Sequence, residues 1–221
     1  MNRITLTLIY FLMIFCPLMG QDNFFKSVTN QEEIDSFIKA LTIETAKIRN
    51  IKADFTQTKK VDFLNESVVS KGILFIAEQK RLRWEYEKPY SFAFIFNGEK
   101  AWMVNQGVET EFDVKSNKIF KELSELMMFG IGGVSLFENP NFDFSYKRSE
   151  EKWGVVLKPK TKEMRSLYSE VELIFSVDYQ MECVRLIDTA GDETLIQLMN
   201  RQINTNLLDD LFHVKSTTHF P

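Results

Sequence analysis

The sequence contains few residues of the kinds that build catalytic and metal sites. Among 221 residues there are two histidines, His213 and His219, both near the C-terminus, and two cysteines that are far apart. No G-x-S-x-G nucleophile motif occurs, and carboxylate pairs such as Glu32-Glu33 stand among polar residues, whereas an acid catalyst needs an apolar setting. We therefore expect no enzyme activity, no metal site and no cofactor.

The chain also lacks an excess of positive charge and a usable pair of cysteines. Its formal net charge is −4 at pH 7, whereas nucleic-acid partners favour a basic surface, so we expect no nucleic-acid partner. Cys16 lies in the N-terminal targeting segment, which leaves Cys183 as the one cysteine of the processed chain. An intramolecular disulfide is then excluded, and stability must come from packing.

Residues 1–20 have the pattern of a secretory signal peptide. Asn2 and Arg3 form a short positive region, residues 4–15 are an apolar run too short to span a membrane, and Gly20 supplies a small residue for cleavage. One alternative is an uncleaved membrane anchor. Another is lipidation of Cys16, but lipidation signals place a small residue just before the cysteine, and residues 13–15 are bulky. We expect cleavage near Gly20, which leaves residues 21–221 as one exported domain.

Residues 71–105 carry the clearest secondary-structure signal in the chain. Apolar and polar residues alternate over residues 82–87, and Asn97-Gly98 has the composition of a tight hairpin turn. The stretch predicts four consecutive antiparallel strands with one aromatic face. Residues assigned to that face include Leu82, Trp84, Tyr86, Phe92, Phe94 and Phe96, with Ala93 and Ile95 opposite. Such a face either covers a packed core or stays open over a cavity, and the sequence alone favours the core.

A helix and a first strand precede this block. Asn30 and Glu33 have the spacing of a capping box, and apolar residues recur every three or four positions up to residue 48, which predicts a helix over residues 30–50. Alternation from Ile51 to about Phe63 predicts the first strand. Gln57 falls on its apolar face, where a buried amide needs partners; we interpret it as fixing a helix end or a neighbouring strand, with cargo contact as the alternative.

After residue 115 the spacing of apolar residues changes from that of a strand to that of a helix. Residues 116–129 read as a short amphipathic helix that ends at a glycine-rich stretch, residues 130–133, and a second apolar piece runs to Pro140. We interpret the segment as a lid, because Met127 and Met128 are adaptable enough to contact varied chains. The alternative is an ordinary covering helix followed by a flexible loop.

From residue 141 the alternation of strands resumes and predicts a second antiparallel meander. In one of its strands, Met181, Cys183, Arg185 and Ile187 are assigned to one face and Val184, Leu186 and Asp188 to the other. Cys183 there is expected to behave as a small apolar residue rather than as a reactive thiol. Residues 207–214 are expected to form a last turn and an edge strand that closes the barrel.

The order of these features resembles the periplasmic outer-membrane lipoprotein carrier family, LolA. The residues that carry the resemblance are Phe55-Thr56-Gln57, Gly72, the run Arg81 to Tyr86, Pro89, Asn97-Gly98 and Trp102. The resemblance implies an α+β fold, an incomplete antiparallel β-barrel of about ten to eleven strands with helices covering the concave face. It implies a monomeric periplasmic carrier that holds the acyl chains of lipoproteins in an apolar cavity. An inner-membrane release complex and an outer-membrane receptor are the implied partners.

The resemblance and the alternation together assign a cargo site. Its sheet side is Phe75, Leu82, Trp84, Phe94, Phe96 and Trp102, and its lid side is Leu126, Met127, Phe129 and Phe137. A register error of one residue would invert a face. Glu78 and Gln79 depart from the family's pattern, in which a basic residue before a proline holds the lid shut. Lys80, Arg81 or Arg83 could take that role, but we interpret these three residues as part of a solvated turn. A carrier of another lipid or pigment, an anchored receptor, a lipid-modifying enzyme and a structural β-domain stay open as alternatives.

Overall fold

The computed structural model describes residues 25–61, 66–113 and 137–214. In the first two ranges these residues form β1 Lys26–Val28, α1 Gln31–Ala46, β2 Asn50–Val61, β3 Glu66–Ala77, β4 Arg81–Lys88, β5 Phe92–Asn97, β6 Ala101–Asn105 and β7 Val108–Phe112. In the third range they form β8 Phe142–Arg148, β9 Lys152–Pro159, α3 Lys162–Arg165, β10 Tyr168–Ser176, β11 Met181–Asp188, β12 Glu193–Ile203 and the 3₁₀ turn η2 Asp209–Phe212.

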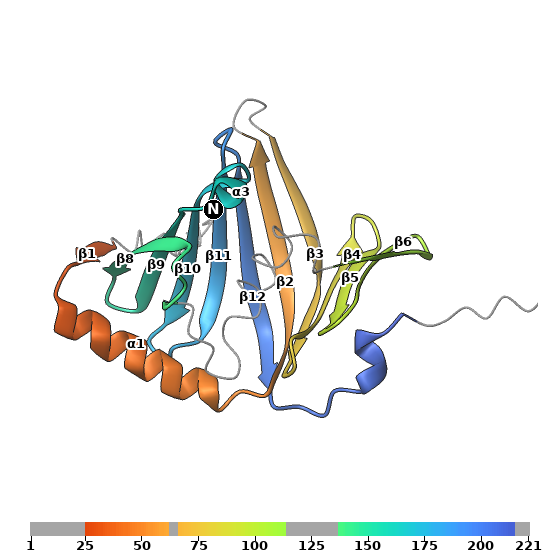
Figure 1. Cartoon of the computed structure of the whole chain (residues 1–221), viewed down its shortest axis with the longest axis horizontal. Helices are drawn as coiled ribbons and strands as arrows, with labels where there is room; N and C mark the ends of the chain where they lie inside the picture. The colour runs from red at the N-terminus through yellow and green to blue at the C-terminus, as the bar shows by residue number, and fades with distance from the viewer. Residues whose placement is uncertain (1–24, 62–65, 114–136, 215–221) are drawn as a thin grey trace, which may run out of the picture.

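All twelve strands belong to one antiparallel sheet (Figure 1). Their order across the sheet is β1-β8-β9-β10-β11-β12-β2-β3-β4-β5-β6-β7, so among the described residues β1 and β7 are the two edges and the twelve strands do not close on themselves. The prediction of an open antiparallel sheet is confirmed, with twelve strands in place of the ten or eleven expected. The pairing of β12 with β2 joins the two halves of the chain.

The four strands predicted over residues 71–105 are present as β3 to β6. The β3–β4 turn places Gln79 and Lys80 at positive φ (64° and 59°). In the β5–β6 turn, Asn97 Oδ1 accepts hydrogen bonds from the backbone N–H groups of Glu99 and Lys100, and Gly98 has a φ of 97°. These turns fix the register in which Leu74, Trp84 and Phe94 lie side by side on one face.

Helix α1 begins where the capping box predicted. Asn30 Oδ1 accepts a hydrogen bond from the backbone N–H of Glu33 at 3.1 Å. The apolar stripe of the helix is buried, and the ring of Phe37 stacks on Trp153 of β9 with 4.3 Å between ring centroids. Figure 1 shows α1 crossing the sheet on the side of β8 to β12, and its buried residues share a core with Leu157 and Leu173 of these strands.

Two apolar clusters lie on this face of the sheet. One joins α1 to β8–β11, and the other is built from β2–β6 and β12. Val184, Leu186 and Leu198 contact both clusters, so the apolar surface is continuous across the sheet.

The C-terminal segment lies on the opposite face and does not form the expected edge strand. Residues 209–212 form the 3₁₀ turn η2, which contacts β4 and β5, and Phe212 is 1% exposed. Arg81 pairs with Asp209, and Arg83 Nη1 donates to the carbonyl oxygen of Leu211 at 3.3 Å. The prediction of a closing strand over residues 207–214 is therefore wrong, because contacts from β4 hold this segment against the face of the sheet rather than along its edge.

Candidate functional site

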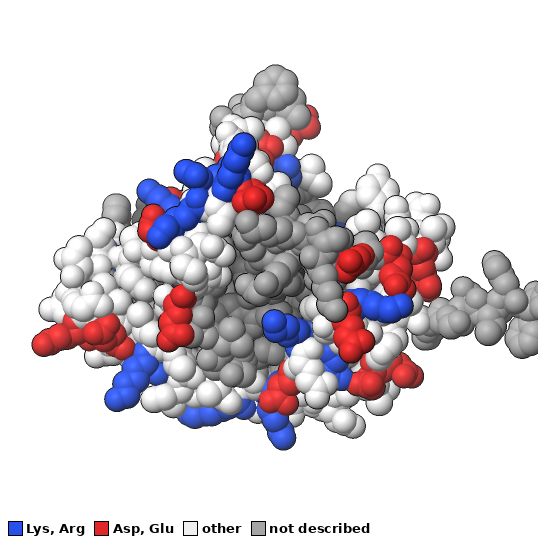
Figure 2. Space-filling view, viewed as in Figure 1, with Lys and Arg blue, Asp and Glu red and all other residues white. Residues whose placement is uncertain are grey.

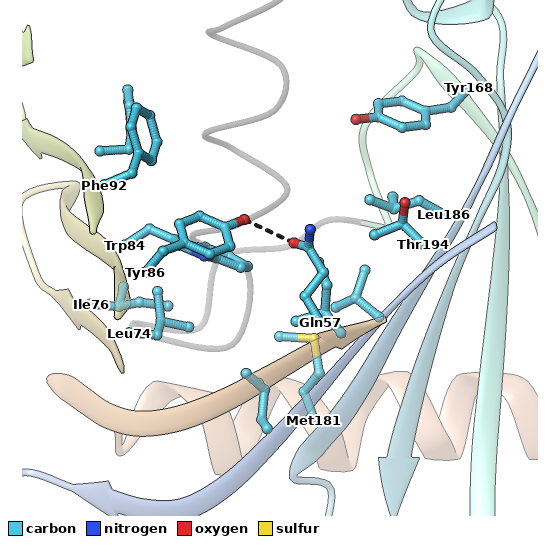
Figure 3. A pocket seen from close by; sticks show the side chains of 14 residues that line it. Gln57, Leu74, Ile76, Trp84, Tyr86, Phe92, Tyr168, Met181, Leu186 and Thr194 are labelled. Atoms are coloured by element: carbon cyan, nitrogen blue, oxygen red, sulfur yellow. Dashed lines mark hydrogen bonds between the residues drawn. The ribbon is translucent and has the colours of Figure 1, made fainter. Parts of the chain in front are cut away.

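An apolar pocket of about 440 Å³ lies between the two halves of the curved sheet (Figure 3). It is lined by side chains from seven strands, β2 to β5 and β10 to β12. The lining residues are Gln57, Leu74, Ile76, Trp84, Tyr86, Phe92, Phe94, Tyr168, Met181, Val184, Leu186, Thr194, Ile196 and Leu198. Four of these fourteen carry a hydrogen-bonding group on an otherwise apolar wall, namely Gln57, Tyr86, Tyr168 and Thr194, besides the indole of Trp84.

Strand register explains why these residues meet. On one side, Leu74 of β3, Trp84 of β4 and Phe94 of β5 are direct cross-strand partners, and on the other Val184 of β11 pairs with Ile196 of β12. Ile196 in turn pairs with Gln57 of β2, which lies in the middle of the sheet. Figure 3 shows the result, with Phe92, Trp84 and Tyr86 on one side of the hollow and Tyr168, Leu186 and Thr194 on the other.

Aromatic rings form the β4–β5 wall of the pocket. The ring of Phe55 lies 5.0 Å from Trp84 and 5.1 Å from Tyr86, centroid to centroid, and Tyr86 lies 6.0 Å from Phe92. Because Phe55 is 1% exposed, it supports this wall from below rather than lining the hollow. Ring contacts of this kind hold side chains in fixed positions, so the wall keeps its shape.

One hydrogen bond crosses the apolar surface. Tyr86 Oη donates to Gln57 Oε1 at 2.8 Å. Burial raises the pKa of the Tyr86 phenol, so the group keeps its proton at neutral pH and remains a donor. Gln57 therefore lies on the apolar face, as its position in the alternation predicted, and it both lines the pocket and binds a residue of β4, a strand that is not its neighbour in the sheet.

The residues predicted for the sheet side divide between the two faces. Trp84 and Phe94 line the pocket, and Leu82 and Phe96 are buried beside it in the same cluster. Phe75 and Trp102 were assigned to the wrong face. Phe75 lines a second hollow on the opposite face, and Trp102 packs there with Ala93 and Ile95.

The two wrong assignments have one physical cause. In residues 72–77 and 101–104 nearly every side chain is apolar, so no polar alternation shows which one faces the core. Neighbouring strands decide instead, because Phe75 pairs with Arg83 and Trp102 pairs with Ile95. Trp102 Nε1 donates to Glu111 of the edge strand β7 at 3.1 Å, which fixes the indole on that side.

Of the predicted lid residues, Leu126, Met127 and Phe129 lie outside the described residues. Phe137 is described and packs against the cluster under α1, where its ring lies 6.4 Å from that of Phe37 and 5.9 Å from that of Phe144.

Only Trp84 and Phe94 of the fourteen lining residues belong to the predicted cargo site. Seven of the others come from the second half of the chain, from which no cargo residue was predicted beyond Phe137: Tyr168, Met181, Val184, Leu186, Thr194, Ile196 and Leu198. Alternation within β12 would have placed Thr194, Ile196 and Leu198 together on one face. Met181 was grouped with Cys183, but an irregularity in the β10–β11 ladder between Ile174 and Phe175 shifts the register and puts Met181 on the pocket face.

The second hollow, on the opposite face, has a different character. It has a volume of about 670 Å³ and lies between β3–β6 and the C-terminal segment. Charged residues line it beside apolar ones, among them Arg83, Glu85, Glu87, Glu109 and Asp210. An alkyl chain would leave these charges without water, so the pocket on the α1 face is the better site for an apolar ligand.

Other kinds of site find little support in the part of the chain that the structure describes. Within residues 25–61, 66–113 and 137–214, no group of three His, Cys, Asp or Glu side chains is placed to hold a metal ion. Over the same residues, no helix has the length and apolar character needed to cross a bilayer. The face shown in Figure 2 carries charged side chains of both signs around its rim.

Comparison with known proteins identifies the family. The outer-membrane lipoprotein carrier protein of Pseudomonas paraeruginosa is 27% identical over 169 residues, covering 76% of this chain and 74% of that one. That of Methylococcus capsulatus is 24% identical over 185 residues, covering 83% and 82%. Among solved structures, a LolA superfamily protein from Nitrosomonas europaea covers 81% of this chain and 97% of its own, with a TM-score of 0.44 and 7% identity. Residues 46–215 match the family of the outer membrane lipoprotein carrier protein LolA, and the chain belongs to that family.

Proposed function

We propose that this protein is a periplasmic carrier that binds the acyl chains of lipoproteins in the pocket on its α1 face and takes them from the inner to the outer membrane. The observation that carries the proposal is the pocket itself. Its fourteen described lining residues are five aromatic, seven aliphatic or methionine and two uncharged polar side chains, and none of the fourteen is charged. Membership of a family of carriers rather than enzymes supports the same conclusion.

The size of the pocket sets how much of a lipid it can hold. With about 440 Å³ and roughly 30 Å³ for a group the size of a water molecule or a methylene, it takes about 15 such groups, the length of one acyl chain. Burying ten methylenes contributes about 8 kcal/mol before the costs of association. A single chain in this pocket therefore gives reversible binding, as a carrier requires.

The proposal also includes the location of the protein in the cell, its partners and the helices that cover the pocket. The signal peptide over residues 1–20, with cleavage near Gly20, sends the chain to the periplasm. An inner-membrane release complex loads it and an outer-membrane receptor accepts the cargo. Helical covering of the pocket face is part of the proposal too. Helix α1 packs on that face over β8–β11, and the predicted lid helix, residues 116–129, lies outside the described residues.

Mass spectrometry of the protein purified from its native envelope tests the cargo. We expect a co-purifying triacylated peptide. A glycolipid or a pigment in its place would assign the chain to another carrier class, and a protein free of lipid would overturn the proposal. Labelling with a radioactive fatty acid, with Cys16→Ser as the control, separates a soluble carrier from an anchored receptor, since the anchored form needs Cys16 modified.

Two variants with the same substitution on opposite faces of the sheet test the pocket. Phe94 and Phe75 are both half-buried, but Phe94 lines the pocket and Phe75 lies on the opposite face. We expect Phe94→Asp to lower the binding of an acyl probe by tenfold or more, and Phe75→Asp to leave it within about twofold. If both variants lose acyl-probe binding equally, and both lose the same amount of stability, then Phe94 is part of the core and not of a binding site.

A further inference from the structure

The pocket contains a hydrogen-bond donor that its own walls do not use. Gln57 Oε1 accepts the Tyr86 proton at 2.8 Å, which turns the amide nitrogen toward the hollow. Figure 3 shows that nitrogen on the side of Thr194 and Leu186. Among the described residues, Gln57 Nε2 makes no hydrogen bond. One N–H donor of the wall thus faces the apolar hollow without an acceptor from the described residues.

Such a donor becomes costly when an apolar ligand covers it. An acyl chain that fills the hollow removes the water to which the N–H can donate, unless the ligand itself supplies an acceptor. The Tyr86 phenol keeps the amide oriented, since burial raises its pKa and it stays protonated. The arrangement is therefore fixed before any ligand arrives, and the missing partner is an acceptor.

The lining also limits the charge of that acceptor. None of the fourteen described lining residues is Lys, Arg or His, so a carboxylate in the pocket would have no counter-charge. A buried anion without a counter-charge is disfavoured far more strongly than a neutral carbonyl. The ligand that fits is an apolar chain joined to a neutral carbonyl, which is an ester or amide of a fatty acid and not the free acid.

We propose that Gln57, held by Tyr86, donates a hydrogen bond to the ester or amide carbonyl of the bound acyl chain and so selects acylated molecules over free fatty acids. This inference rests on the proposed function and adds the polar half of its recognition. Burial of the acyl chain supplies the affinity, and the hydrogen bond to its carbonyl group sets how deeply the acyl chain enters the pocket. Thr194 of the neighbouring strand β12 lines the same side of the hollow, and its hydroxyl offers a second donor for a ligand with two ester groups.

Three probes with the same sixteen-carbon chain test the inference, each measured by displacement of a fluorescent acyl probe. They are 1-palmitoylglycerol, its ether analogue 1-hexadecylglycerol, and palmitate. We expect the ester to bind about tenfold more tightly than the ether, a difference of about 1.4 kcal/mol. Palmitate at pH 8 is expected to bind more weakly than the ester by at least the same factor.

Variants assign the difference to Gln57. Gln57→Leu should reduce ester binding to the level of the ether while leaving ether binding within about twofold. Tyr86→Phe should reduce the preference in part, because the amide can then rotate. Gln197→Leu, the same exchange at an exposed position on β12, is the matched control and should change nothing. Circular dichroism confirms that each variant is folded, and Tyr86→Phe keeps the test valid if Gln57→Leu does not fold.

Each outcome has a separate meaning. Tight and equal binding of ester and ether would overturn this inference and leave the proposed function standing. Palmitate binding as tightly as the ester would also overturn it. If Gln57→Leu weakens all three probes equally, Gln57 shapes the hollow and recognises no carbonyl. Failure of every probe to bind would count against the proposed function itself.

Discussion

The ring of Phe55 occupies the space that a side chain on Gly72 would fill. The two residues are direct partners in the β2–β3 ladder, and a Cβ on Gly72 would lie 2.9 Å from Phe55 Cε1 and 1.9 Å from the carbonyl oxygen of Glu85. Phe55 in turn contacts Trp84 and Tyr86, so the absence of a side chain at position 72 lets the aromatic wall of the pocket form.

We expect Gly72→Ala to lower the free energy of unfolding by about 3 kcal/mol, because the backbone of β4 cannot move aside without breaking its ladder. Gly107→Ala is the control. Its Cβ would meet nothing within 4 Å, and its φ of 81° alone should cost about 1 to 2 kcal/mol. Denaturant unfolding measures both, and a smaller loss at Gly72 than at Gly107 would contradict the steric explanation.

A second prediction concerns the buried carboxylate of Glu172, which is 3% exposed. Lys147 Nζ lies 2.7 Å from Glu172 Oε1, and Gly154 of the intervening strand β9 leaves room for the lysine chain to cross. Lys147→Met keeps most of the packing and removes the charge. We expect a loss of about 1 to 2 kcal/mol in the free energy of unfolding, less than for a fully buried pair because Arg185 remains 3.5 Å away.

Lys160→Met is the control for this prediction, because it makes the same substitution in an exposed ion pair. Lys160 lies 3.4 Å from Asp143 in a pair whose side chains are both more than half exposed, so its loss should stay within about 0.5 kcal/mol. Equal effects at the two lysines would mean that Glu172 does not depend on Lys147.

The third prediction is that Cys183 is an unreactive thiol. Burial raises its pKa to about 11, so at pH 8 very little thiolate exists in the folded protein. In a chain carrying Cys16→Ser, alkylation by iodoacetamide at pH 8 should be at least about 100-fold slower in the native state than in urea, where the pKa is about 8.5. The native rate should rise with pH up to about 11. A plateau below pH 9 would contradict the assignment.

The fourth prediction is an acid-dependent loss of stability through Glu193. Arg185 Nη2 donates to Glu193 Oε2 at 2.8 Å, and this hydrogen bond lowers the pKa of the carboxyl. A lowered pKa in the folded state gives stability that is present above the unfolded value of about 4.3 and is lost as the pH falls through the folded value. Glu193→Gln should therefore lower the free energy of unfolding at pH 7 by less than about 1 kcal/mol, since the pair is partly exposed.

Measuring unfolding of both proteins from pH 7 to pH 3 checks this prediction. The difference between wild type and Glu193→Gln should shrink below about pH 4 and vanish when the carboxyl is protonated. A difference that stays constant over the whole range would show that the exchange acts through packing and not through charge.

Much of the fold could be predicted because local signals there were strong. Asn30 and Glu33 marked the start of α1, and Asn97-Gly98 marked the β5–β6 turn, since caps and turns depend on residues close in sequence. The alternation through Leu82, Trp84 and Tyr86 fixed one wall of the pocket for the same reason. Gln57 also fell on the predicted face, although its partner Tyr86 was not foreseen.

The candidate site was predicted only in part, and each error has a local reason. Phe75 and Trp102 stand in runs where apolar residues occupy both faces, so periodicity cannot orient them. Met181 was misassigned because a register irregularity between β10 and β11 reversed the alternation. Residues 207–214 were expected to pair along an edge, but Arg81 and Arg83 bind them to the face of the sheet.

Most of the strands, the start of α1 and the presence of an apolar, aromatic-rich face follow from the amino-acid sequence, because caps, turns and alternation depend on residues close together in the chain. The pairing of β12 with β2, more than a hundred residues apart, and the curvature that brings Phe92 and Tyr168 to opposite sides of the pocket follow from the folded structure alone. Those outcomes depend on pairing and curvature between distant strands, for which no short stretch of sequence carries a signal.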